Sequence, residues 1–435
     1  MHSSERSKRR LPIHVLALGW VVCICVVLDL QTQGSDWPQW RGPARTGYTP
    51  AGEPVLETLP TEPKTLWKAS SGFALASPVV AHDRVYYMEQ AEGKEVLVCA
   101  KSDTGERVWG ETIDQTFTDT QASPGPRCTP MVDGDRVYAV SCRGELQCRE
   151  AATGKLLWHK NYTQDFEAVF IGERGAAMGA TRHGNDGSPL IVGDRLYACA
   201  GGTNGAGIVC LDKASGAVIW KSQNDTAAYA PPTIEKLGAG SPELLCFTAE
   251  AVIGLQPEDG KLLWRFPVKT SFGRHVGVPL VHEDTVVVSS HEAGLIGLRI
   301  SSSGAPSECK AEQAWVSKEA AVNFTSSVSV EGHLYSVGAK QDFVCVEMKT
   351  GAVKWSKGGY FTSAAGKAHA GLIVTGKNIL ALTDTGELVL FKADPAEFRE
   401  LGRAQVCGAN WCNPAYADGR IYLRDAKSVY CIALR

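Results

Sequence analysis

The sequence predicts an all-β fold, an eight-bladed β-propeller of four-stranded antiparallel blades that is closed by an N-terminal strand. Three observations lead to this prediction. A glycine turn followed by a tryptophan recurs along the chain, alternating apolar runs precede each copy, and one outermost strand is missing at the C-terminal end. The tryptophans of successive copies lie 40 to 62 residues apart, a period typical of propellers built from four-stranded units.

The recurring unit is clearest at residues 210–220. A strand ends at Cys210, a turn lies at Ser215-Gly216, and a second strand leads to Trp220, four residues after the glycine. Glycine permits the positive φ of a tight turn, and Asp212 can hydrogen-bond the turn backbone. Each tryptophan should bury roughly 150–250 Å² against the neighbouring blade. The predicted docking residues are Trp67, Trp109, Trp158, Trp220, Trp264, Trp315 and Trp355.

Two further strands precede each unit. They begin with Ser-Pro or Thr-Pro and an alternating apolar run, as in residues 77–86, 129–138 and 188–197. A proline at the first position of a strand removes no ladder hydrogen bond, and Gly-Asp favours a hairpin turn. Each unit is therefore predicted to hold four antiparallel strands.

A count of the strands predicts how the ring closes. Eight innermost strands are expected, starting at Ser77, Thr129, Ser188, Pro231, Val278, Ser326, Ala370 and Cys412. Seven outermost strands follow them, because the chain ends at Arg435. Residues 63–70 contain Trp67 but have no preceding blade strands. We therefore expect residues 66–69 to pair with residues 429–433 and complete the eighth blade.

Residues 1–34 are predicted to be a secretory signal peptide. Four basic residues precede an apolar run at residues 13–28, and small residues follow it. The alternative is an uncleaved anchor at residues 13–30, although a membrane span needs about 20 apolar residues and Asp29 interrupts this run. Residues 35–61 are expected to form an N-terminal clasp across the propeller of residues 62–435; the alternative is a tail that packs its aromatic residues on the outer blades.

Composition excludes one class of partner. Without residues 1–34 the chain carries 40 basic and 45 acidic residues. This balance gives no electrostatic footprint for nucleic acid. The other properties are those of an ordinary globular chain, which we expect to be a monomer.

The 12 cysteines that follow residue 34 are expected to be mostly core residues. Five of them occupy the small-residue position before the turn, where a free cysteine acts as a small hydrophobe; these are Cys99, Cys148, Cys210, Cys345 and Cys431. Two pairs could form disulfides, Cys142–Cys148 and Cys407–Cys412. A bridge requires Cα atoms within about 7 Å, which a hairpin can provide.

The turn-and-tryptophan unit resembles the docking motif of the pyrroloquinoline quinone (PQQ) repeat family. Residues 37–43, Trp-Pro-Gln-Trp-Arg-Gly-Pro, resemble the opening of many exported bacterial propellers in that family. The resemblance covers residues 36–435 and implies an exported protein of the periplasm or cell envelope. The family includes quinoprotein dehydrogenases and also the lipoprotein propeller of the outer-membrane β-barrel assembly machinery, which binds no quinone.

Two functions follow from this resemblance. One is a scaffold that binds a protein, a peptide or a small ligand; the other is a PQQ-dependent alcohol or sugar dehydrogenase. A quinone site needs cations for the PQQ carboxylates, an aromatic floor and Ca²⁺ with oxygen ligands. In the quinoprotein dehydrogenases a vicinal disulfide covers the quinone ring. This sequence has no adjacent cysteine pair and no evident calcium ligands, which favours the scaffold.

Candidate binding residues lie in the connections between blades, which converge on the central channel of a propeller. The pair Arg182-His183 recurs as Arg274-His275, and other connections carry Arg127, Tyr229 and Asn323. The side chains predicted to face the channel are Arg182, His183, Arg274, His275, Lys367, His369 and Trp411.

Such cations with aromatic neighbours suit an anionic ligand, either planar or peptide-like. The alternative is that the arginines tie neighbouring loops together. Histidines placed one to a blade around a wide axis argue against a metal site. No catalytic group is assigned.

Overall fold

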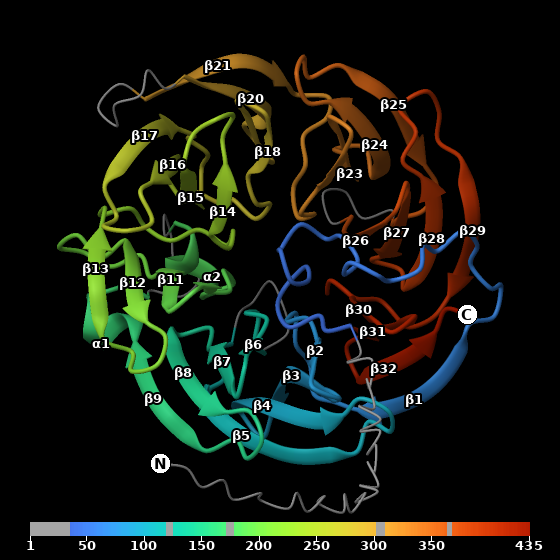
Figure 1. The fold of residues 1–435 in the computed structure, drawn as a ribbon, viewed down its shortest axis with the longest axis horizontal. Helices are drawn as coiled ribbons and strands as arrows, with labels where there is room; N and C mark the ends of the chain where they lie inside the picture. Colours follow the sequence, from blue (N-terminus) through green and yellow to red (C-terminus); the bar gives the residue numbers. More distant parts are fainter. Residues whose placement is uncertain (1–34, 119–124, 171–177, 302–308, 363–367) are drawn as a thin grey trace, which may run out of the picture. The chain divides into compact units, whose positions relative to one another are not determined.

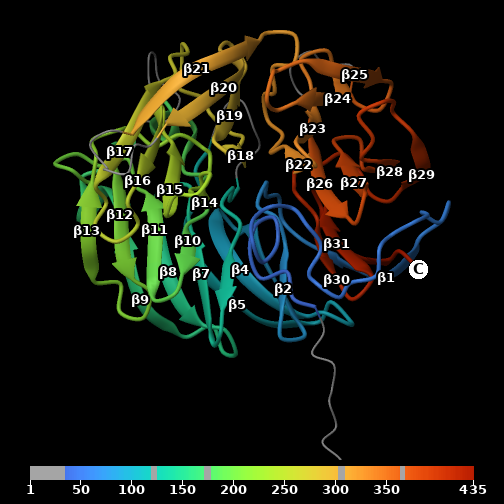
Figure 2. The ribbon, with the colours of Figure 1, turned by 45° about the horizontal axis from the view of Figure 1, so that its top comes forward.

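Eight four-stranded antiparallel sheets surround a central axis (Figure 1). The computed structural model describes residues 35–118, 125–170, 178–301, 309–362 and 368–435. The predicted signal peptide at residues 1–34 lies outside this part of the chain. Figure 2 shows the sheets side by side around the ring. The predicted fold class is confirmed.

The first four blades follow each other along the chain. Blade 1 comprises β2 (Val79–Ala81), β3 (Arg84–Ala91), β4 (Lys94–Lys101) and β5 (Arg107–Gln115). Blade 2 comprises β6 (Met131–Asp133), β7 (Arg136–Val140), β8 (Glu145–Glu150) and β9 (Leu156–Asn161). Blade 3 comprises β10 (Leu190–Val192), β11 (Arg195–Cys199), β12 (Ile208–Asp212) and β13 (Val218–Ser222). Blade 4 comprises β14 (Thr233–Lys236), β15 (Pro242–Phe247), β16 (Ala251–Leu255) and β17 (Leu262–Pro267).

Three more blades continue this order. Blade 5 comprises β18 (Leu280–His282), β19 (Thr285–Ser290), β20 (Gly294–Ser301) and β21 (Lys310–Ser317). Blade 6 comprises β22 (Val328–Val330), β23 (His333–Val337), β24 (Asp342–Glu347) and β25 (Val353–Gly358). Blade 7 comprises β26 (Ala370–Thr375), β27 (Asn378–Thr383), β28 (Glu387–Lys392) and β29 (Glu400–Gln405).

Blade 8 joins the two ends of the propeller. It comprises β30 (Ala415–Ala417), β31 (Arg420–Arg424), β32 (Ser428–Ala433) and β1 (Lys64–Ser70). Lys64 lies opposite Ala433, and Ser70 lies opposite Ser428. The predicted closure by the N-terminal strand is therefore confirmed.

Two short helices lie between blades 2 and 3, α1 (Tyr162–Phe166) and α2 (Ala180–His183). Asn161 caps α1 by accepting hydrogen bonds from the backbone of Thr163 and Gln164. Within the described ranges, no helix has the length and apolar character needed to cross a membrane.

Six tryptophans connect an outermost strand to the next blade. Trp67 Nε1 donates to the carbonyl of Ser102 at 2.8 Å, and its ring lies against Gly105, where an added Cβ would stand 2.6 Å from a ring carbon. Gly105 has φ +71°, so both space and backbone require glycine there. The same donation to a carbonyl of the next blade is made by Trp109, Trp158, Trp220, Trp315 and Trp355.

Trp264 makes a different contact. Its Nε1 donates to Glu243 Oε2 in its own blade at 2.6 Å. The connection between β20 and β21 of the next blade is longer than the corresponding connections of blades 1 to 4, where a glycine turn receives Trp67, Trp109, Trp158 and Trp220.

The described cysteines are free thiols, and the five at the pre-turn position are fully buried as predicted. Neither candidate disulfide is present. Cys407 Sγ donates to the carbonyl of Gly408, whereas Cys412 Sγ donates to that of Leu75. Cys148 lies opposite Tyr138 in its sheet, while Cys142 Sγ donates to the carbonyl of Gly125. The thiols of each pair therefore face different neighbours.

Buried thiols should resist labelling in the native protein. Burial raises the pKa of Cys99 and of Cys210 to about 11, so almost no reactive thiolate exists at pH 8. We expect a maleimide to label the half-buried Cys309 first and to label Cys99 and Cys210 only after unfolding in guanidinium. Peptide mass spectrometry measures this order. Rapid native labelling of Cys210 would contradict the strand assignment.

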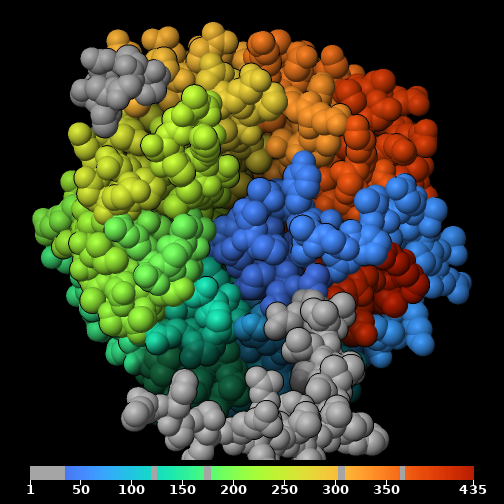
Figure 3. Space-filling view, viewed as in Figure 1, coloured from blue at the N-terminus to red at the C-terminus, as the bar shows by residue number. Residues whose placement is uncertain are grey.

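An N-terminal segment, residues 35–59, runs across one face of the ring, where Figure 3 shows its atoms in blue from the centre toward the edge. Trp37 exchanges backbone hydrogen bonds with Val80 of blade 1 at 2.8 and 2.9 Å. The amide of Thr49 donates to the carbonyl of Val374 of blade 7, and the amide of Val374 donates to Gly47. The segment therefore pairs with the free inner edges of innermost strands, which are otherwise open to another chain.

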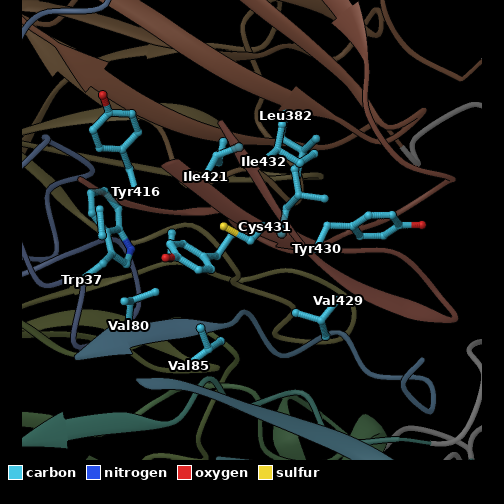
Figure 4. Packing of buried hydrophobic residues seen from close by; sticks show 14 of the residues in the cluster. Trp37, Val80, Val85, Leu382, Tyr416, Ile421, Val429, Tyr430, Cys431 and Ile432 are labelled. Carbon is cyan, nitrogen blue, oxygen red and sulfur yellow. The ribbon is translucent and has the colours of Figure 1, made fainter. Parts of the chain in front are cut away.

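The largest core cluster lies where blade 8 meets blades 1 and 7 (Figure 4). Trp37 belongs to this cluster, together with buried side chains of all three blades, and is 1% exposed. Buried Arg424 also links blade 8 to blade 1, because it donates to the carbonyls of Met88 and Gly72, both at 2.5 Å. The N-terminal segment and the closing blade thus share one core.

Candidate functional site

A cavity of about 540 Å³ is formed by the connections between blades and by the starts of the innermost strands. Its volume is within the usual range for small-ligand sites. The lining residues are Trp40, Leu75, Ser77, Arg127, Thr129, His183, Asp186, Ser188, Tyr229, Pro231, Arg274, Val276, His291, Asn323, Phe324, Ser326, His369, Trp411 and Asn413.

The structure brings together four of the seven residues predicted to face the channel, which are His183, Arg274, His369 and Trp411. Two others are not among the lining residues. The Arg182 guanidinium lies over the Phe272 ring at 4.1 Å, and His275 is fully buried, with its ring 4.1 Å from that of Phe247. Lys367 lies outside the described residues.

Each Arg-His pair is divided because consecutive side chains point in different directions. His183 closes α2 and lines the cavity, while the preceding Arg182 does not. In the second pair the arginine lines the cavity and the histidine enters the core. Gly273, with φ +54°, turns the backbone just before Arg274. The same Arg-His dipeptide therefore places its histidine in the cavity wall in one connection and its arginine there in the other.

Two arginines supply positive charge to the cavity. Arg127 Nη1 donates to the carbonyl of His183 at 2.7 Å, which joins two connections. Arg274 Nη2 donates to Asn323 Oδ1 at 3.3 Å, and its guanidinium lies 5.0 Å from the centre of the Phe324 ring. Burial lowers the pKa of Arg274. Both arginines therefore line the cavity and also tie neighbouring loops together.

Burial shifts the pKa values of three other groups of the cavity wall toward their neutral forms. Burial lowers the pKa of His369 to about 4, and it also lowers that of His291. Burial raises the pKa of Asp186 to about 6, despite the opposing effect of Arg127. Asp186 is the one carboxylate among the lining residues. The two arginines therefore outnumber the one carboxylate of the described wall, and its positive charge is greater below about pH 6, where Asp186 is protonated.

Aromatic rings form much of the remaining wall. The Trp411 ring lies 4.7 Å from that of Phe324 and 6.4 Å from that of His369, at 25° to the latter. Tyr229 is held by a hydrogen bond from its hydroxyl to the carbonyl of Gly179 at 2.6 Å. Flat apolar surface thus lies beside fixed cations.

Sequence reasoning missed the role of the Ser-Pro and Thr-Pro starts. The amide of Ser77 donates to Thr129 Oγ1 of the next blade at 3.1 Å, and the amide of Thr129 donates to Ser188 Oγ at 2.9 Å. Asn413 likewise donates to Ser77 Oγ across the closure. These hydroxyls accept hydrogen bonds from backbone amides around the cavity rim. The recurrence of Ser-Pro and Thr-Pro in the sequence was the signal from which this role could have been predicted.

Trp40, Asp186 and His291 are further lining residues that were not singled out. Asp186 belongs to a glycine-rich connection, which is a signal for a site. Trp40 belongs to a segment remote in sequence, and no local pattern places it beneath the cavity.

The residues present do not fit a PQQ site with calcium. Ca²⁺ takes six to eight oxygen ligands and favours several carboxylates. Asp186 is the only carboxylate among the described residues of the cavity wall, and the part of the chain that the structure describes contains no cluster of three or more potential metal ligands from His, Cys, Asp and Glu. The sequence also lacks adjacent cysteines that could form a vicinal disulfide.

Comparison with known proteins agrees with this architecture. Two solved structures are similar over most of their length: BamB from Moraxella catarrhalis (15% identity, 86% of this chain and 100% of that chain, TM-score 0.56) and the computationally designed Ika8 protein (9% identity, 85% and 99%, TM-score 0.57). Quinohemoprotein alcohol dehydrogenase from Comamonas testosteroni is more distant (14% identity, 92% and 80%, TM-score 0.49). At these identities the likeness shows the fold alone.

No curated protein matches the chain significantly. The sequence profile described as outer membrane protein assembly factor BamB matches residues 57–178 and 93–357, which together span more than half of the chain. The chain therefore belongs to this BamB-like family of PQQ-repeat propellers.

Proposed function

We propose that this protein is an exported binding propeller of the periplasm or cell envelope, and that its central cavity takes an anionic ligand with a flat apolar body. The ligand is either a small molecule or a segment of a protein partner. The observation that carries this proposal is the cavity wall, where Arg127 and Arg274 lie beside aromatic rings. Cations in a low-dielectric cleft focus the field and attract anions even when the net charge is negative.

The alternative, a PQQ-dependent alcohol or sugar dehydrogenase, has less support because the described cavity wall has a single carboxylate for calcium and the sequence has no adjacent cysteines. Protein purified with PQQ and Ca²⁺ should show neither a bound quinone chromophore nor dye-linked alcohol oxidation. Either signal would reverse the ranking of the two functions.

A matched pair of fluorescent dyes tests the proposal. The anion 1-anilino-8-naphthalenesulfonate and the neutral N-phenyl-1-naphthylamine share an aromatic body and differ by the sulfonate. We expect the sulfonate dye to bind more tightly than the neutral dye. Its affinity should fall as salt is added, since salt screens charge. Arg274→Ala should weaken it by about tenfold or more, the value of a charge-assisted hydrogen bond.

Arg299→Ala is the matched control, because Arg299 is 59% exposed on β20 and does not line the cavity. It should leave both dye affinities unchanged. Equal binding of the two dyes would contradict the proposal. A lower melting temperature in Arg274→Ala with unchanged dye binding would show that Arg274 only ties the loops together.

A further inference from the structure

The N-terminal segment closes the cavity from one side. Trp40 lines the cavity, and its sequence neighbours bond to innermost strands on several sides of the ring. Pro38 accepts a hydrogen bond from the amide of Val132 in blade 2, and the Tyr48 hydroxyl donates to the carbonyl of Ser329 in blade 6. Together with the bonds to blades 1 and 7, these contacts hold the segment across the axis (Figure 3).

Arg45 is a buried cation beneath the cavity lining. It is 4% exposed, and its Nη1 donates to the carbonyls of Ser188 at 3.2 Å and Pro232 at 3.3 Å. Its remaining contacts are the carbonyl of Pro189, Gln39 Oε1 and Met131 Sδ. No carboxylate of the described residues lies within ion-pair distance of it. Ser188 itself lines the cavity, so this charge lies directly behind the wall.

Arg41 repeats this arrangement on blade 6. It is 2% exposed, and its Nη2 donates to the carbonyls of Thr46 at 3.0 Å and Ser327 at 2.5 Å. Its Nε and Nη1 have no hydrogen-bond partner among the described atoms. Burial lowers the pKa of Arg41 to about 10, and the charge of Glu235 opposes this shift. Burial lowers the pKa of Arg45 to about 9, and no carboxylate opposes the shift there.

We propose that residues 37–49 are the floor of the ligand site and that the buried charges of Arg45 and Arg41 help to attract its anion. This inference rests on the proposed function of the cavity. A buried charge without a counter-charge is costly, and an anion in the cavity offsets part of that cost. The N-terminal segment is thus part of the binding site as well as part of the fold.

The test uses the same two dyes with charge-changing variants. Arg45→Gln should weaken binding of the sulfonate dye by about five- to tenfold and leave the neutral dye unchanged, since charge acts across a low-dielectric wall. Arg45→Lys keeps the charge and should retain most of the affinity. Arg41→Gln should have a smaller effect, because Glu235 already offsets that charge. The inference would be overturned if Arg45→Gln lowered the affinity for both dyes equally, or if it lowered neither affinity.

Wild-type protein provides a test that does not depend on the folding of a variant. Coupling between two sites is reciprocal, so an anion that is attracted by the floor must also stabilise the floor. The sulfonate dye should slow hydrogen exchange at the amides of Gly42 and Gly47 more than the neutral dye does. Unchanged exchange would contradict the inference. If the proposed function itself were wrong, the result would be different from these two. The wild type and Arg274→Ala would then bind the sulfonate dye equally weakly.

Discussion

Trp67→Ala should lower the free energy of unfolding by about 3–5 kcal/mol, the usual cost of removing a large buried aromatic side chain. Trp67 is 8% exposed, donates to the carbonyl of Ser102 and covers Gly105, so the variant loses a hydrogen bond and opens a cavity at the closure of the ring. Denaturant unfolding measures the change. Leu66→Ala is the control, because Leu66 is 36% exposed on the same strand and should cost little.

Deletion of residues 36–70 should have a still larger effect. It removes β1 from blade 8 and leaves β32 as an unpaired edge, which is a template for aggregation. It also removes Trp37 from the core that blades 8, 1 and 7 share. We expect aggregation or a far lower melting temperature. A soluble deletion variant with an unchanged melting temperature would show that the ring does not need its terminal strand.

The fold was predictable because the residues that form the contact between two blades follow a short, recurring sequence pattern. A tight turn needs its glycine, and the tryptophan that packs on such a turn lies at a fixed distance after the glycine of its own blade. The closure followed from the same logic, since Trp67 had a docking role but no blade of its own. Trp264 marks the limit of this reasoning. Its partner is Glu243 within its own sheet, and the next blade has a longer connection between β20 and β21.

The site was predictable only in part, because loops do not repeat the geometry of strands. The sequence indicates that Arg274 and His275 enter a connection between blades, but not which of them faces the axis. The backbone conformation at Gly273 determines the directions of the two side chains, and the His275 ring packs against Phe247. Trp40 and Arg45 depend on long-range contacts of the N-terminal segment. Such contacts leave no repeating pattern in the sequence from which they could be predicted.

Asp186→Asn should tighten binding of the sulfonate dye by about tenfold at pH 7.5 and should flatten its pH dependence. Burial raises the pKa of Asp186 to about 6, so the wild-type cavity gains a negative charge as the pH rises from 5 to 7. A charge of the same sign as the ligand costs on the order of 1–2 kcal/mol at an effective dielectric constant of about 20. Wild-type affinity should therefore fall over this range. His369, whose pKa is about 4, is already neutral there.

The same substitution should stabilise the protein at neutral pH. The folded state holds the Asp186 proton more tightly than the unfolded state, whose pKa is near 3.8, so wild-type stability should decline as the pH rises from about 4 to about 6. Asp186→Asn should remove that part of the decline, about 1–2 kcal/mol once partial contact with solvent is allowed for. Glu95 and Glu235, whose pKa values burial raises to about 7 and about 6, should contribute to the pH dependence that remains. Identical pH profiles of wild type and variant, in both dye binding and unfolding, would show that Asp186 does not control the charge of the cavity.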